Sequence, residues 1–120
     1  MAENKNGLLF TTTDPRGYTV SLSSQQYYDH IVSTEDHQAH TEFEPAEIKE
    51  CVEKPDVIYQ SNSVPTSDLY YGKTSVQYPY LYLRTVVSMD HEEKKGEVVT
   101  AYLSKHMTGG GKLRYVKPKL

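Results

Sequence analysis

The sequence predicts an α+β domain in which two N-terminal helices pack on one face of an antiparallel β-sheet of about four strands. Apolar residues recur at helical spacing in the segment before Pro55, and they alternate with polar residues in the segment after it. Helices followed by a meander of strands are typical of this fold class. The chain has 120 residues, which suffices for one domain with a single hydrophobic core.

The two helices are expected between residues 23 and 54. Ser23 or Ser24 can cap the first helix, which is expected to run to about Ser33. Pro45 opens the second helix at a position where its missing amide hydrogen costs nothing, and Pro55 follows its end. The apolar stripe of the second helix consists of Ile48, Cys51 and Val52.

Four strands are expected after Pro55, and turn-rich segments separate them. They cover residues 56–61, 69–73, 78–89 and 97–104. The charged segment "DHEEKKG" lies between the last two strands and predicts a β-hairpin centred on Glu93. The sequence therefore predicts that the last two long strands are direct neighbours in the sheet.

The predicted register of this hairpin brings an arginine, a phenol and a hydroxyl together. It places Arg84 opposite Tyr102 and Val86 opposite Thr100, on the face away from the core. The same register pairs Leu83 with Leu103 and Val87 with Val99. Arginine donates a planar fork to phosphate oxygens and tyrosine can stack on a base, so this patch suits a nucleotide. An ordinary polar solvent face is the alternative interpretation.

Charge is distributed unevenly along the chain. Residues 1–58 contain 4 Lys/Arg and 11 Asp/Glu, whereas residues 94–120 contain 7 Lys/Arg and 1 Glu. We interpret residues 1–17 as a loosely ordered arm, residues 18–107 as the folded domain, and residues 108–120 as a Gly-rich joint with a basic tail. Such a tail can attract phosphate groups, and a solubilising segment is the alternative.

Several protein classes do not fit the composition. Cys51 is the single cysteine, which excludes an internal disulfide and a Cys-rich zinc module. No apolar run approaches the roughly 20 residues that span a bilayer, and the first residues do not resemble a signal peptide. We therefore expect a soluble, cytoplasmic protein that does not enter membranes.

Three of the five histidines, His30, His37 and His40, fall in one short acidic run. Zinc ligation by His37 and His40 with Asp36 or Glu42 is one interpretation, but these residues lack a regular ligand spacing. Acid–base use of His30, near the end of the first predicted helix, is the preferred interpretation. We therefore expect neither a metal nor another cofactor.

A series of short motifs resembles a known nuclease family. "YYDHIV", "HTE", "VEKPDVIY", "LYYGK", "LYLRTVV" and "VVTAYLS" follow one another in this order. Together they resemble the phage-type nuclease domains of the barnase/EndoU/colicin/RelE-like (BECR) superfamily over residues 18–107. The resemblance implies the α+β fold described above and a metal-independent endoribonuclease, toxin-like or phage-associated, that cleaves RNA through attack by the 2′-OH.

The resemblance also implies a site and partners. Candidate catalytic residues are His30, His40 (or His37 in its place), Arg84, Thr100 and Tyr102. Candidate RNA-binding residues within the matched segment are Tyr71, Lys73 and Tyr82, and the charge of the basic tail adds Lys112 and Arg114. The family often has an arginine directly after the tyrosine pair, whereas Gly72 precedes Lys73 here. An immunity or antitoxin protein is a possible partner beside RNA, and a noncatalytic RNA-binding or protein-interaction module is the alternative function.

Overall fold

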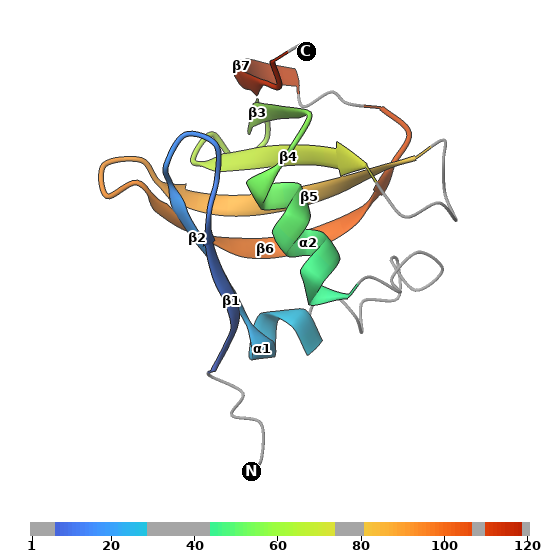
Figure 1. The fold of residues 1–120 in the computed structure, drawn as a ribbon. Coiled ribbons are helices and arrows are strands. Elements are labelled where there is room, and N and C mark those ends of the chain that lie inside the picture. Colours follow the sequence, from blue (N-terminus) through green and yellow to red (C-terminus); the bar gives the residue numbers. More distant parts are fainter. Residues whose placement is uncertain (1–6, 29–43, 74–80, 107–109, 119–120) are drawn as a thin grey trace.

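The computed structural model describes residues 7–28, 44–73, 81–106 and 110–118, which form one curved sheet with short helices on it (Figure 1). The strands are β1 (Leu8–Thr13), β2 (Thr19–Ser23), β3 (Val57–Ser61), β4 (Ser67–Lys73), β5 (Tyr82–Asp90), β6 (Lys95–Ser104) and β7 (Gly110–Val116). The helices are α1 (Ser24–Gln26) and α2 (Pro45–Glu53). The strand order is β1-β2-β6-β5-β4-β3-β7, in which β2 and β6 are parallel and all other neighbours are antiparallel.

The predicted fold class is wrong. Two N-terminal helices on a sheet of about four antiparallel strands were expected, but the described residues form a mixed sheet of seven strands with two short helices. The four predicted strands exist as β3 to β6. The sheet gains β1, β2 and β7 from segments that were assigned to the N-terminal arm, to the approach to the first helix and to the basic tail.

The predicted N-terminal arm supplies the first strand and the turn of a β-hairpin whose second strand is β2. The Asp14 carboxylate accepts hydrogen bonds from the backbone N–H groups of Arg16 at 2.8 Å and Tyr18 at 2.9 Å. Gly17 has a φ of 91°, a conformation that glycine adopts without strain. The three consecutive threonines of β1 favour an extended backbone, and Phe10 is buried. The "DPRG" segment therefore closes a hairpin between β1 and β2.

Gly110 and Gly111 of the glycine run in the tail belong to β7 and are not a free joint. A Cβ atom at Gly111 would collide with the backbone carbonyl of Gln60 on β3. Glycine is therefore needed where β7 approaches β3, and Gly110 pairs with Ser61 in the same register.

The second helix agrees with its prediction. Pro45 occupies the first turn, and the Glu47 side chain accepts a hydrogen bond from the backbone N–H of Glu44 at 3.1 Å. Its buried residues are Ile48, Cys51 and Val52, as expected. At α1, Ser23 accepts from the backbone N–H of Gln26 at 3.0 Å, which confirms the predicted cap. Tyr27 and Tyr28 continue the helical backbone, and residues 29–33 of the predicted helix lie outside the described residues.

The predicted register of the β5–β6 hairpin is confirmed at three pairs and wrong at one. Arg84 lies opposite Tyr102, Val86 opposite Thr100, and Leu83 opposite Leu103. Val87, however, pairs with Val98 and not with Val99, because the register shifts between Val86 and Val87. The extra residue is a β-bulge in β6, and it buries Val98 in place of Val99.

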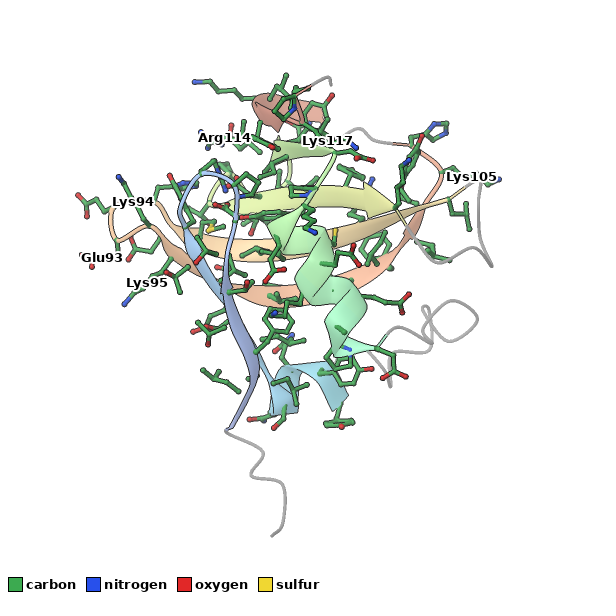
Figure 2. All side chains as sticks on the ribbon, viewed as in Figure 1. Glu93, Lys94, Lys95, Lys105, Arg114 and Lys117 are labelled. Carbon is green, nitrogen blue, oxygen red and sulfur yellow. The ribbon has the colours of Figure 1, made fainter. Side chains whose placement is uncertain are left out.

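The core lies between the sheet and the elements that cross one of its faces. In Figure 1, α2 runs over β4 and β5, and the β1–β2 hairpin lies beside it. The core includes Val20 and Leu22 from β2, the buried stripe of α2, and inward side chains of the central strands. The charged β5–β6 turn, marked by Glu93 and Lys94 in Figure 2, projects from one end of the sheet.

Gly96 lies on β6 where β2 pairs with it in parallel, and substitution there tests how tightly this part of the sheet is packed. It pairs with Val20 and Met89, and a Cβ atom there would lie 2.7 Å from the carbonyl oxygen of Ser88. We expect Gly96→Ala to lower the free energy of unfolding by about 1–3 kcal/mol, because the backbone must move to admit a methyl group. Urea unfolding followed by tyrosine fluorescence measures this. Glu97→Ala, on the exposed face of the same strand, is the control and should change it by less than about 0.5 kcal/mol. Equal effects would contradict the packing argument.

Candidate functional site

Arg84 occupies the middle of the sheet face opposite α2. Its Nη1 donates a hydrogen bond to the Tyr102 hydroxyl at 2.7 Å, and its Nη2 donates to the Ser104 hydroxyl at 3.3 Å. Its guanidinium carbon lies 5.1 Å from the ring centroid of Tyr71 and 5.3 Å from that of Tyr102. These contacts hold the guanidinium between two aromatic rings, an arrangement that cation–π attraction favours.

Two rows of side chains cross this face through directly paired residues. The first row is Tyr102, Arg84, Tyr71, Val57 and Val116, from β6 to β7. The second row is Thr100, Val86, Leu69, Tyr59 and Leu113, over the same strands. Paired residues project to the same side of a sheet, and these two rows define what we call the Arg84 face. It carries several aromatic rings and one arginine.

The polar groups of the Arg84 face differ in burial. Tyr71 is buried, and burial raises the pKa of its phenol while the Arg84 charge opposes the change. The Tyr59 ring stands edge-on to Tyr71 with centroids 6.2 Å apart. Thr100 Oγ1 is buried and has no hydrogen-bond partner in the described part of the chain. Tyr59, Arg84 and Tyr102 are partly exposed and can meet a ligand.

The other predicted site residues are distributed in three places. Lys73 pairs with Tyr82 where β4 ends and β5 begins, next to the first row, and Lys73 is exposed. Lys112 is exposed on β7. Arg114 contacts Asp68 and so lies on the opposite side of the sheet from Arg84. The candidates His30, His37 and His40 lie outside the described residues.

Sequence reasoning missed a cluster of charged side chains under the β1–β2 turn. Its centre is Asp68 of β4, which is fully buried. The nearest basic nitrogen atoms to its carboxylate are Nη2 of Arg16 at 3.0 Å, Nε of Arg114 at 3.5 Å and Nε2 of His91 at 4.0 Å. We call these residues, together with Asp14 and Tyr70, the Asp68 cluster.

Asp14 gives this cluster its second carboxylate. Its Oδ2 accepts hydrogen bonds from the Tyr70 hydroxyl at 2.6 Å and from Arg16 Nη2 at 2.9 Å. Burial opposes the charge on Arg16, but Tyr70, Asp14 and Asp68 outweigh burial and raise its pKa. Burial, followed by the Asp14 carboxylate, raises the pKa of Tyr70. The carboxylates of Asp14 and Asp68 are thus matched by the guanidinium groups of Arg16 and Arg114. Their contacts connect the β1–β2 turn with β4 and β7.

A hollow of about 510 Å³ lies beside the end of α2 and reaches Lys73. Its walls carry Lys54, Lys73 and Lys117, and also Glu50, Glu53 and Asp56. Because three cations and three carboxylates balance, the hollow does not select a phosphate by charge. The Arg84 face remains the better candidate for a nucleotide.

Neither a metal site nor a membrane-spanning helix is found in the described part of the chain. Within residues 7–28, 44–73, 81–106 and 110–118, no group of three or more His, Cys, Asp and Glu side chains is arranged to hold a metal ion. In the same ranges, no helix has the length and apolar character that crossing a membrane requires.

Comparisons with known proteins assign no family to the chain. No family model, no curated protein and no solved structure matches it significantly. The resemblance to the BECR nucleases stays a prediction, and the arrangement of helices and strands that it implied is not the one observed.

Proposed function

We propose that the chain binds single-stranded RNA across the Arg84 face, with the Arg84 guanidinium holding a phosphate. One observation carries the proposal: hydrogen bonds to Tyr102 and Ser104 fix Arg84 between two tyrosine rings at the centre of this face. A guanidinium recognises phosphate oxygens through its planar fork, and exposed aromatic rings stack on bases without regard to sequence.

The dimensions of the Arg84 face suit a short stretch of RNA. Neighbouring strands lie about 4.8 Å apart, so a row that crosses five strands spans about 19 Å. Tyr59 and Tyr102 are partly exposed and lie on either side of Arg84, on β3 and β6. Sheets that recognise RNA in other proteins stack two or three bases on such rings. Lys73 at one end of the face extends the attraction to the RNA backbone.

The finer proposal is metal-independent cleavage of the bound RNA through attack by the 2′-OH. It is favoured by the hydroxyl groups of Tyr102 and Ser104, which touch Arg84 and so adjoin any phosphate that Arg84 holds. Cleavage needs a base for the 2′-OH proton, a cation for the charged phosphorane and an acid for the leaving oxygen. Arg84 supplies the cation, Tyr102 is a candidate proton donor, and His30 is the candidate base. A noncatalytic RNA-binding module is the alternative.

Removing the arginine tests the proposed binding. We expect Arg84→Ala to raise the Kd for a fluorescein-labelled oligouridine by about tenfold or more, because a desolvated arginine–phosphate contact is lost. Lys105→Ala, which removes an exposed cation after the end of β6, should change the Kd less than about twofold. Fluorescence anisotropy measures both, with thermal unfolding as the check that each variant folds. Equal Kd values for Arg84→Ala and the parent would refute the assignment.

Tyr102→Phe separates binding from cleavage. It retains the aromatic ring and the Arg84–Ser104 hydrogen bond but removes the hydroxyl that accepts from Arg84 Nη1, so RNA affinity should fall by about threefold at most, less than in Arg84→Ala. If the chain cleaves RNA, the rate should fall by about 10²-fold or more, the usual value of a positioned proton donor. The assay contains EDTA and detects fragments that end in a 2′,3′-cyclic phosphate. Binding without any such fragments would favour the noncatalytic module.

A further inference from the structure

β7 forms one edge of the sheet. In the described part of the chain it pairs with β3 alone, so the backbone groups along its outer side do not take part in the ladder. An unpaired strand edge is a template for another extended chain. With seven residues, β7 is long enough to hold an added strand in register.

Exposed apolar side chains gather along this edge. Leu113 is 47% exposed and Val116 is 54% exposed, and both belong to β7. Val64 is 50% exposed in the turn after β3, close to the start of β7, where Gly110 pairs with Ser61. A group of exposed apolar residues at one edge indicates contact with another molecule.

All charged side chains in the segment that contains β7 are positive. Residues 105–120 contain five Lys/Arg and no Asp or Glu. Figure 2 shows Arg114 and Lys117 beside β7, where Arg114 pairs with Asp68 and Lys117 pairs with Asp56 at 3.1 Å. Lys112 is exposed and forms no ion pair among the described residues.

The two sides of β7 differ in character. Leu113 and Val116 belong to the rows of the Arg84 face. Lys112 directly precedes Leu113 and Lys117 directly follows Val116, so strand alternation places both lysines on the other side. A complementary strand would therefore be apolar on one side and acidic on the other.

We propose that the outer edge of β7 binds an extended acidic segment of a partner protein, which adds to the sheet as an eighth strand. Backbone hydrogen bonds to β7 hold this segment, its apolar side chains meet Leu113 and Val116, and its carboxylates meet Lys112 and Lys117. A second copy of the same edge is disfavoured as the occupant, because pairing β7 with itself brings like charges together. This interface shares Leu113 and Val116 with the end of the Arg84 face, but the proposal does not rest on RNA binding there.

A designed peptide tests the interface on the full chain. The probe is a fluorescein-labelled peptide of about eight residues in which valine and glutamate alternate, a common strand length and the required pattern. We expect saturable binding by fluorescence anisotropy. The same peptide with N-methyl groups on alternate backbone nitrogens should bind at least about tenfold more weakly, since it keeps its charge and loses its backbone donors. Equal binding of both peptides, or no binding at millimolar peptide, overturns the proposal.

Matched variants locate the interface. Lys112→Glu and Val116→Lys should each weaken peptide binding by about tenfold. The first places a negative charge opposite the glutamates of the peptide, and the second places a charge opposite its valines. Leu8→Lys changes an apolar residue that is 60% exposed on the opposite edge strand, β1, and should leave the affinity unchanged. Arg84→Ala should also leave it unchanged, whatever that variant does to RNA binding. Concentration-dependent dimerisation that Val116→Lys abolishes would instead identify a second copy as the occupant and would overturn the acidic partner.

Discussion

Replacing Asp68 with Ala should lower the free energy of unfolding by about 3–5 kcal/mol, because the change leaves Arg16 and Arg114 without their shared buried carboxylate. Asp68 is fully buried and both guanidinium groups are mostly shielded from water, so water cannot solvate them in place of the lost carboxylate. Urea unfolding followed by tyrosine fluorescence measures the loss. Asp68→Asn keeps the volume and removes the charge, and it serves if the alanine variant does not fold.

Asp56 is the matched control for Asp68. Both carboxylates pair with a cation near the C-terminus, but the Lys117–Asp56 pair is much more exposed than the Arg114–Asp68 pair. Exposed ion pairs contribute about 0–1 kcal/mol, and Asp56→Ala should cost no more than that. Equal losses for Asp68→Ala and Asp56→Ala would show that the Asp68 cluster does not stabilise the fold through burial.

The protein should lose stability steeply in alkaline solution, by several kcal/mol between pH 9 and pH 11. Burial raises the pKa of the Cys51 thiol from 9.0 to about 12. Burial and the Asp14 carboxylate also raise the pKa of Tyr70 above its usual 10.0. Both groups stay neutral in the fold and ionise in the unfolded chain. Their contribution is therefore complete below the unfolded pKa values and is lost as pH rises toward the folded ones, by about 1.4 kcal/mol per pH unit for each group.

Two variants separate these contributions by the slope of stability against pH. Cys51→Ala should flatten the slope first, from about pH 9, and Tyr70→Phe should flatten it only above about pH 10. The absolute stability of each variant also falls through lost packing, so the slope and not the stability at one pH is compared. A parent protein with the same stability at pH 7 and pH 11 would contradict the proposed ionisations.

Local chemistry determined the parts of the fold that the sequence predicts well. Pro45 and Pro55 delimit α2, and its three apolar residues fall on one side at helical spacing. The β5–β6 register followed from a charged turn between two alternating strands. The bulge at Val99 could not be predicted from the sequence. Residues 98 and 99 are both valine, so the alternation of apolar and polar residues does not indicate which of them is buried.

Long-range pairing determined the parts that the prediction missed. β2 joins the sheet through parallel contacts with β6, more than 70 residues later, and no local pattern indicates such a partner. The glycines of β7 indicated a flexible joint, because the close approach to Gln60 exists only in the folded sheet. Arg114 was assigned to RNA by its place in a charge run, but charge counts do not tell on which side of a strand a residue lies.

The candidate site was partly accessible to the same reasoning. Arg84, Thr100 and Tyr102 were grouped by the hairpin register, and the structure places them on one face. The Asp68 cluster was missed because its members come from four separate segments of the chain. One signal was available: Asp68 directly precedes the predicted strand 69–73 and lies two residues before Tyr70, so a strand that begins one residue earlier places this carboxylate on the same side as a large aromatic residue.

The parallel contact between β2 and β6 has a consequence for synthesis on the ribosome. Val20 and Leu22 leave the ribosome early, but β6 follows only after about 80 further residues. At about 5–20 residues per second, translation takes roughly 4–16 s to supply that strand. The nascent β1–β2 hairpin therefore stays without its parallel partner strand for that time, although α2, which packs on β1, is synthesised well before β6.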